Sequence, residues 1–454
     1  MPTRRTLLTT IAGTSLGLAL PRIPSAQTLA DGPLRGGLDA GDAGILPDRS
    51  DDQSDALQQL ITRAASIRQP VFLPPGRYEV SSLDLPDGSR LSGVPGATRL
   101  VHRGTDPLLS ARDCRHVALS GLTLEGGGQG LAEDAGGLLS FRNVETLVLD
   151  ECEILGSAKN GIHLERCGGR IDTCRISGAS RAGVLSLEGK ALTIRDNHVS
   201  DCGNGGILIH RWTSGDDGAM VTGNRIERIA ALDGGTGQHG NGINIYLADN
   251  VLVADNHIRD CAFSALRANS ASNIVMRGNT CLNSGETAIY AEFAFQGAII
   301  SDNLVDGAAN GILVVNLDVG GRLATVSGNL LRNLTLTAPY EHTGAGFGFG
   351  IAAEADTVIT GNVIETAATY GLMLGWGPYL QDVVASGNII RKVPVGIAVS
   401  VVEGSGKTLI AGNLISEAPQ GAIVGYRWRE KVTDDLIGGS KAYPHLTLAD
   451  NRSR

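Results

Sequence analysis

A short motif recurs along this chain and limits what it can fold into. The motif is Gly or Asp, then Asn, any residue, and Ile, Leu or Val, with Cys in place of Asn in the first two copies. The anchors are Cys152, Cys174, Asn197, Asn224, Asn256, Asn279, Asn303, Asn329, Asn362, Asn388 and Asn413. They lie 22 to 33 residues apart. This period indicates a repeat architecture with one turn per copy.

A second pattern follows most anchors, as in GIHL, GILI, GINI, TAIYA and GILVV. Apolar residues at every second position in such short pieces predict β-strands. One turn cannot bury its apolar side alone, whereas stacked turns place each Ile on the next Ile and let each Asn bond the backbone of its neighbour. We therefore predict an all-β fold, a parallel β-helix (solenoid), in which the Asn column is structural.

Both ends of the repeat region predict caps. Ser50 and Gln53 form a capping box, and an apolar stripe follows at Ala56, Leu57, Leu60, Ile61 and Ala64, so we expect an amphipathic helix that covers the open end. The repeat pattern is lost after Tyr426. The predicted parts are a signal peptide over residues 1–26, an N-terminal cap over 27–100, a β-helix of about a dozen turns over 101–426, and a C-terminal cap or tail over 427–454.

The amino terminus has the pattern T-R-R-x-L-L around Arg4 and Arg5, followed by an apolar stretch. This predicts a twin-arginine signal, cleaved after Ala26 or Ala30, and the export machinery as a partner. An ordinary secretory signal is the alternative, and both predict a periplasmic or secreted protein. Removing residues 1–26 changes the formal charge from -9 to -12, which disfavours nucleic-acid binding. No later apolar run is long enough for a membrane span.

Seven cysteines are present and no C-x-x-C pair occurs, so no zinc or redox motif is predicted. Cys152 and Cys174 would lie on adjacent turns about 4.8 Å apart. A disulfide is one interpretation of that pair, and two buried thiols are the interpretation we favour. The sequence identifies no cofactor.

These features resemble the right-handed parallel β-helix proteins of the pectate-lyase-like superfamily. The resemblance rests on PDRSDDQSDALQQLI, on VFLPPGRYEV and on the Asn-anchored turns, and it covers roughly residues 40 to 425. More narrowly, the amino terminus with such turns is similar to a bacterial family of twin-arginine-exported β-helix repeat proteins. That narrower resemblance implies fold and export and no activity.

Subtracting the scaffold leaves the residues that alternate with the buried ones and point outward. The first outward column is predicted as His163, Leu185, Leu208, Asn244, Arg267, Tyr290, Leu313, Ala352, Met373, Ala398 and Val424. The second is Glu165, Leu187, His210, Tyr246, Asn269, Glu292, Val315, Glu354, Gly375, Ser400 and Tyr426. Polar and aromatic groups concentrate in the middle turns, where we predict a binding groove over residues 210 to 292.

The three longest insertions flank this groove, over residues 209–220, 229–242 and 333–348. Solenoid insertions often form loops on the binding face. They carry Trp212, Asp216, Asp217, Gln238, His239, Tyr340, Glu341 and His342.

β-Helix lyases and epimerases remove the proton next to a uronate carboxylate, which must first be neutralised. On this resemblance Arg267 and Asn244 would neutralise the carboxylate, His210 or His239 would take the proton, and Tyr290 or Tyr246 would return one. Glu292 completes the predicted catalytic set, and the predicted substrate-binding residues are Tyr246, Asn269, Trp212 and Glu354. The partner would be an acidic polysaccharide. The D-P-H motif of mannuronan epimerases is absent.

Other functions stay open at this point. Glu292 and Glu354, two turns apart, would suit an inverting glycoside hydrolase. GDDG at 215–218 and QHGNG at 238–242 resemble polygalacturonase motifs, but they fall on different faces. A noncatalytic carbohydrate-binding or envelope-structural protein would stack sugars on its aromatic residues. A metal on His210, His239 and Asp216 has no supporting spacing, so no metal ligands are predicted.

Overall fold

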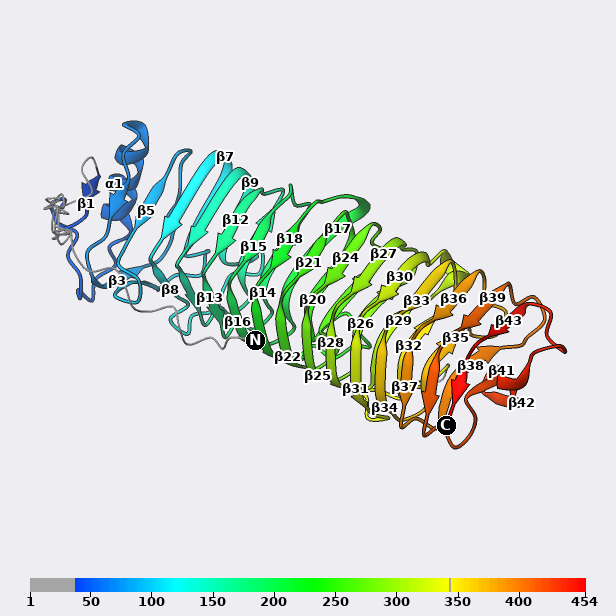
Figure 1. The fold of residues 1–454 in the computed structure, drawn as a ribbon. Helices are drawn as coiled ribbons and strands as arrows, with labels where there is room; N and C mark the ends of the chain where they lie inside the picture. Colours follow the sequence, from blue (N-terminus) through cyan, green and yellow to red (C-terminus); the bar gives the residue numbers. More distant parts are fainter. Residues whose placement is uncertain (1–36, 343) are drawn as a thin grey trace, which may run out of the picture. The chain divides into compact units, whose positions relative to one another are not determined.

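The computed structural model describes residues 37–342 and 344–454, so the predicted signal peptide lies outside the described residues. Gly37–Arg454 forms one compact unit of stacked β-strands whose order follows the chain (Figure 1). The predicted right-handed parallel β-helix is confirmed. Within the described residues, no helix is long and apolar enough to cross a membrane.

Each turn adds one strand to each of three parallel ladders, which we number in chain order within a turn. The first ladder holds β4 (Leu83–Asp84), β7 (Leu109–Ser120), β9 (Gly137–Asp150), β11 (Asn160–Glu165), β14 (Ala182–Leu187), β17 (Gly205–Asp216), β20 (Asn241–Asp249), β23 (Leu266–Asn269), β26 (Thr287–Glu292), β29 (Asn310–Val314), β32 (Phe349–Ala353), β35 (Tyr370–Leu374), β38 (Val395–Ser400) and β41 (Ile423–Arg427).

The second ladder holds β1 (Leu38–Asp39), β2 (Val71–Phe72), β5 (Arg90–Ser92), the later parts of β7 and β9, β12 (Gly169–Asp172), β15 (Thr193–Arg195), β18 (Met220–Thr222), β21 (Leu252–Ala254), β24 (Ile274–Arg277), β27 (Gln296–Ser301), β30 (Arg322–Ser327), β33 (Thr357–Thr360), β36 (Val383–Ser386), β39 (Thr408–Ala411) and β43 (Leu446–Ala449).

The third ladder holds β3 (Gly76–Val80), β6 (Thr98–His102), β8 (Thr123–Glu125), β10 (Glu153–Leu155), β13 (Arg175–Ser177), β16 (His198–Cys202), β19 (Arg225–Ile229), β22 (His257–Cys261), β25 (Thr280–Ser284), β28 (Leu304–Ala308), β31 (Leu330–Leu334), β34 (Val363–Ala367), β37 (Ile389–Arg391), β40 (Leu414–Ser416) and β44 (Arg452–Ser453). The other elements are α1 (Ser54–Ser66), η1 (Leu317–Val319), η2 (Leu436–Gly438) and β42 (Glu430–Asp435), which pairs antiparallel with β41.

The core is a stack of like side chains inside the coil. On the first ladder, equivalent residues of five consecutive turns pair one after another, in the order Ile207, Ile243, Leu266, Ile289 and Ile312. All five are buried, at 1% exposure or less. The stacking of Ile on the equivalent residue of the next turn is confirmed.

The asparagine ladder is confirmed as a chain of hydrogen bonds between turns. Asn279 is typical: its backbone N–H and its Nδ2 both donate to Oδ1 of Asn303, at 2.9 and 3.0 Å. Its own Oδ1 accepts the same two bonds from Asn256. The ladder runs from Asn197 to Asn413 and continues to Asn451, which lies beyond the predicted anchors.

The residue before each ladder asparagine explains the Gly or Asp of the motif. Gly278 and Asp302, for example, have φ of 65° and 58°. Only glycine adopts this left-handed region freely, and Asp and Asn tolerate it better than most residues.

The favoured prediction of two buried thiols at Cys152 and Cys174 is confirmed. Cys152 and Cys174 are buried and free, as are the other five cysteines. The backbone N–H of Cys174 donates to Oδ1 of Asn197 at 2.8 Å, so the cysteines begin the same ladder.

The predicted helix is present as α1, and its buried residues Leu57, Leu60, Ile61 and Ala64 join the solenoid core. Ala56 is exposed, and the helix begins at Ser54, four residues after the predicted cap. The capping-box prediction is wrong because Asp52 is the acceptor here, taking the N–H of Ser54 at 2.9 Å.

Strand pairing extends past both expected limits of the repeat region. At the amino-terminal end β1 pairs with β2 and β3 pairs with β6, within the region expected to be only a cap. At the other end β43 and β44 pair in parallel with β39 and β40. The tail therefore returns to the stack and covers its last turn.

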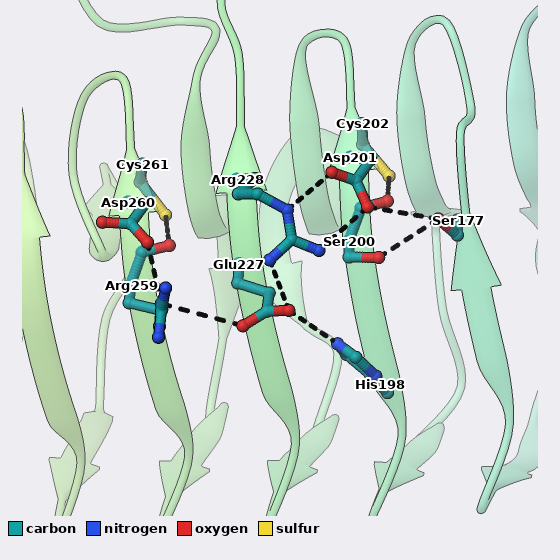
Figure 2. A network of polar contacts seen from close by, with 10 residues as sticks. All are labelled: Ser177, His198, Ser200, Asp201, Cys202, Glu227, Arg228, Arg259, Asp260 and Cys261. Carbon is teal, nitrogen blue, oxygen red and sulfur yellow. Dashed lines mark hydrogen bonds and ion pairs between the residues drawn. The ribbon is translucent and has the colours of Figure 1, made fainter.

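The outer face of the third ladder carries an ion-pair network that joins consecutive turns (Figure 2). Glu227 on β19 is its centre and contacts His198 at 3.1 Å, Arg228 at 2.5 Å and Arg259 at 3.7 Å. Arg228 also forms two bonds to Asp201, at 2.7 and 3.0 Å. Strands β16, β19 and β22 are thus linked by side chains as well as by backbone.

We expect Glu227→Gln to lower the free energy of unfolding by about 1 kcal/mol at neutral pH, because partly exposed pairs contribute modestly. Burial acts to raise the pKa of Glu227, but hydrogen bonds from Arg228 and His198 outweigh it and lower the pKa. A carboxylate with a lowered pKa stabilises the fold above its unfolded pKa and loses this effect as pH falls through the folded value. Urea unfolding at pH 7 and pH 3 should therefore show a difference from wild type that shrinks in acid, and the exposed Glu145→Gln should show no difference at either pH.

Candidate functional site

The outward face of the first ladder carries both predicted columns in register. In the first column Asn244 pairs with Arg267, and Arg267 with Tyr290. In the second, His210 pairs with Tyr246, and then come Asn269 and Glu292. The structure therefore brings these seven residues together on four consecutive strands.

Arg267 is held inside the protein rather than presented to solvent. Its Nε and Nη2 donate to the two oxygens of Glu292 at 2.6 and 2.9 Å, and Nη1 donates to Glu286 at 2.8 Å. Arg267 is 8% exposed, and Glu286 and Glu292 are 1% and 2% exposed. Its guanidinium also lies 5.0 Å from the ring centroid of Tyr290. The predicted carboxylate-neutralising group is thus already neutralised by two carboxylates of the chain.

The 229–242 insertion covers this ion-pair cluster. Gly237 lies so close that a Cβ atom there would sit 2.0 Å from Nη1 of Arg267. The groove predicted over residues 210 to 292 is therefore closed at its centre. Burial also raises the pKa of Tyr290, which makes it a poor proton donor.

The other predicted catalytic residues His210, His239 and Asn244 are buried or half-buried. Burial lowers the pKa of His210 to about 4, so its imidazole is neutral, and its Nε2 has no partner among the described residues. The rings of His210 and Tyr246 meet edge to face, with centroids 5.7 Å apart, while Asn244 is 5% exposed. His239 is half-buried in the covering loop.

Trp212, in the 209–220 insertion, is accessible to solvent. It is 52% exposed, and the Arg166 guanidinium lies 4.9 Å from its ring centroid. In the same insertion Asp217 is buried, and burial raises its pKa to about 6.

The two carboxylates of the hydrolase hypothesis have separate internal partners. Glu292 binds Arg267 and also accepts from Nδ2 of Asn269 at 3.1 Å. Glu354 accepts the backbone N–H groups of Asn316 and Leu317, each at 2.7 Å, and burial raises its pKa to about 7. Glu354 lines a pocket that Glu292 does not reach, so they do not face one common space.

An open cleft of about 520 Å³ lies at the amino-terminal end of the same face. We call it the N-terminal cleft. The two outward columns continue into it: Ser110, Ser140 and His163 are paired in register, and so are Arg112, Arg142 and Glu165. Its lining is Ser82, Asp84, Asp106, Pro107, Ser110, Ala111, Arg112, Asp134, Ala135, Gly136, Ser140, Phe141, Arg142, His163 and Glu165.

The charged groups of the N-terminal cleft differ in their partners. Arg142 donates to Glu165 at 2.8 Å, whereas Arg112 is exposed and forms no ion pair with any described residue. Burial lowers the pKa of His163, so the imidazole is neutral at pH 7. Its Nδ1 is buried without a partner among the described residues, against Gly136. The cleft thus combines an arginine without an ion-pair partner among the described residues, a neutral base, and the side chains of Asp84, Asp106 and Asp134.

A smaller pocket of about 150 Å³ lies further along the same face, under the 333–348 insertion. We call it the aromatic pocket, after Tyr290, Tyr340, Phe347, Phe349 and Trp376 in its wall. Its floor is apolar because the outward columns carry Leu313, Val315, Ala352 and Met373 here, which pack as a second cluster outside the solenoid core.

Sequence reasoning missed both cavities. The motif begins at Cys152, so the turns that carry Arg112 and Arg142 were not aligned with the columns. Glu286 lies one residue before β26 and outside both columns. A signal for the aromatic pocket was present, because a chain with only 4% aromatic residues concentrates them between residues 340 and 428.

Solved structures with a similar fold include two phage proteins. They are the pre-mature bacteriophage phi29 gene product 12 (TM-score 0.51, 13% identity) and bacteriophage CBA120 tailspike protein 3 (TM-score 0.53, 12% identity). Each match covers 91% of this chain, which spans 66% and 61% of the two phage chains. The catalytic unit of the GH87 α-1,3-glucanase of Streptomyces thermodiastaticus matches at a TM-score of 0.48 and 14% identity, over 94% of this chain and 70% of that one. No curated protein matches the sequence.

One family model matches by sequence, and its description is periplasmic copper-binding protein (NosD). It matches residues 132–292 and 264–443, which together make up more than half of the chain. The twin-arginine family suggested by the amino terminus stays a prediction. The chain belongs to the NosD family.

Proposed function

We propose that this is an exported protein that acts on an acidic polysaccharide, by abstracting the proton next to a uronate carboxylate in the N-terminal cleft. The observation that carries the proposal is that Arg112, which has no ion-pair partner among the described residues, lines the same open cleft as His163, whose neutral imidazole lies two turns further along the ladder against Gly136. Export is supported by the predicted signal and by the periplasmic description of the family.

The chemistry requires the carboxylate charge to be offset before the neighbouring C–H proton can leave. Arg112 supplies that charge, and Arg142 lies beside it on the next strand. His163 accepts the proton because its lowered pKa keeps the imidazole neutral. Asp84, Asp106 and Asp134 line the cleft and would accept hydrogen bonds from sugar hydroxyls, which a small inorganic anion lacks. In this proposal Arg112 neutralises the carboxylate and His163 takes the proton, which are the roles predicted from the sequence for Arg267 and His210.

The test follows the exchange of the proton next to the carboxylate by NMR, with a panel of uronate polysaccharides in deuterated water. Wild type should exchange or eliminate this proton with at least one polymer. His163→Gln and Arg112→Ala should each slow the reaction by about 100-fold or more, which is the scale of a lost general base. Arg90→Ala, an exposed arginine on the second ladder, should retain the wild-type rate.

Two outcomes would contradict the proposal. Saturable line broadening without exchange would leave a carbohydrate-binding protein without this chemistry. Exchange that survives His163→Gln but is lost in His210→Gln would return the reaction to the groove predicted over residues 210 to 292.

The family description also names copper. Among the described residues, no group of three His, Cys, Asp or Glu side chains is arranged to hold a metal ion. All seven cysteines are buried, and burial raises the pKa values of Cys202 and Cys281 to about 12, so these thiols are not poised as thiolate ligands. The residues that the structure describes do not fit a copper centre, and no step of the proposed reaction uses one.

A further inference from the structure

The aromatic pocket has a geometry that the proposed reaction does not use. The rings of Tyr340 and Phe347 lie nearly perpendicular, with an interplanar angle of 73° and centroids 5.6 Å apart. His342 meets Phe347 in the same way, at 82° and 5.7 Å. Trp376 and Met373 complete the wall and floor. Aromatic groups thus surround a space of about 150 Å³ from several directions.

The same pocket carries two buried carboxylates, and the two nearby cations, Arg267 and Arg429, are not among its lining residues. Glu286 and Glu354 line it, and they are 1% and 7% exposed. Arg267 forms an ion pair with Glu286 and another with Glu292. The ion-pair cluster around Arg267 therefore holds two carboxylates and one guanidinium. No Lys or Arg is among the described residues that line the pocket. Arg429 bonds the carbonyl groups of His342 and Gly344.

Two further titratable groups, His342 and Glu354, set the charge of the pocket near pH 7. Burial lowers the pKa of His342, so it adds no positive charge near pH 7. Burial raises the pKa of Glu354 to about 7, with Asp318 adding to the rise and two backbone N–H groups opposing it, so this carboxyl is about half ionised near pH 7. A cation in the pocket would stabilise the ionised form of Glu354.

We propose that the aromatic pocket binds an organic ammonium cation with a methylated headgroup of the trimethylammonium type. Such a group cannot donate hydrogen bonds, and it is recognised by aromatic faces together with nearby negative charge. An anionic ligand would meet Glu286 and Glu354, and a metal ion would lack a third donor among the described side chains. The proposal is independent of the polysaccharide reaction, because the two cavities share no residue.

The test is titration calorimetry of the full chain with choline and with 3,3-dimethyl-1-butanol, the uncharged compound of the same shape. Choline should bind at least tenfold more tightly than the alcohol. Trp376→Leu and Glu354→Gln should each weaken choline binding at least fivefold. Trp212→Leu removes a tryptophan outside the pocket and should leave choline affinity unchanged.

Equal affinities for the two ligands would show that the pocket is only apolar and would overturn the proposal. Unchanged choline affinity in both Trp376→Leu and Glu354→Gln would place any binding elsewhere, with the same consequence. If circular dichroism shows that Trp376→Leu does not fold, Phe347→Leu is used instead, because Phe347 is another aromatic residue of the pocket wall. Because choline binding needs no polysaccharide, failure here and failure of the cleft reaction are separate results.

Discussion

Replacing Asn279 by alanine should lower the free energy of unfolding by about 3–5 kcal/mol, the range of the largest single-residue effects. The side chain is fully buried and donates to carbonyl groups of Val253 and Arg277 as well as to Asn303. Alanine would leave the backbone N–H of Asn256 without an acceptor inside the coil, and the Nδ2 of Asn256 would keep only its bond to the carbonyl of Val221. Buried donors without partners each cost about 1–3 kcal/mol.

Urea denaturation followed by circular dichroism measures this effect. The matched control is Asn283→Gly, because Asn283 is exposed, has a φ of 52° that glycine accepts, and bonds through its side chain to the exposed side of the coil at Asp260. The control should change stability by less than about 1 kcal/mol. A loss this small in Asn279→Ala as well would mean that the ladder does not hold the turns together.

Replacing Arg267 by alanine should destabilise the fold by about 3–5 kcal/mol, because it leaves Glu286 and Glu292 buried without their cation. The triple variant Arg267→Met, Glu286→Gln, Glu292→Gln should recover most of this loss, since it removes the buried charges together. Arg332→Ala breaks a half-exposed pair with Asp306 and should cost less than about 1 kcal/mol.

Thermal unfolding and the polymer exchange assay together separate two roles for Arg267. A structural role predicts that the triple variant is stable and still reacts with the polymer. An Arg267→Ala protein that is as stable as wild type yet inactive would contradict the structural role and restore the carboxylate-neutralising role predicted from sequence.

Much of the scaffold was predictable because it repeats. Ile243 and Asn256 follow local patterns that recur in turn after turn, and a repeated pattern in a stacked fold fixes register as well as strand type. The outward columns followed from the same register, so the neighbours Asn244, Arg267 and Tyr290 were placed together correctly.

The state of the candidate site was not predictable in the same way. Arg267 is neutralised by Glu286, which lies outside both columns, and it is covered by Gly237 from an insertion. Neither contact follows from the repeat, because insertions have no equivalent in neighbouring turns. The N-terminal cleft was missed for a related reason, since the turns that carry Arg112 and Arg142 precede the first anchor.

The sequence by itself determined the parallel solenoid, its inward Ile stack, its asparagine ladder and the residues that share its outer face. These depend on period and residue type, which act through short-range strand geometry and nearest-neighbour stacking. Only the tertiary structure decided which outward residues are open to a ligand. In the folded chain the predicted groove is closed over Arg267, whereas Arg112 and His163 line an open cleft. Loop packing and long-range ion pairs decide this difference, and they are set by the non-repeating parts of the chain.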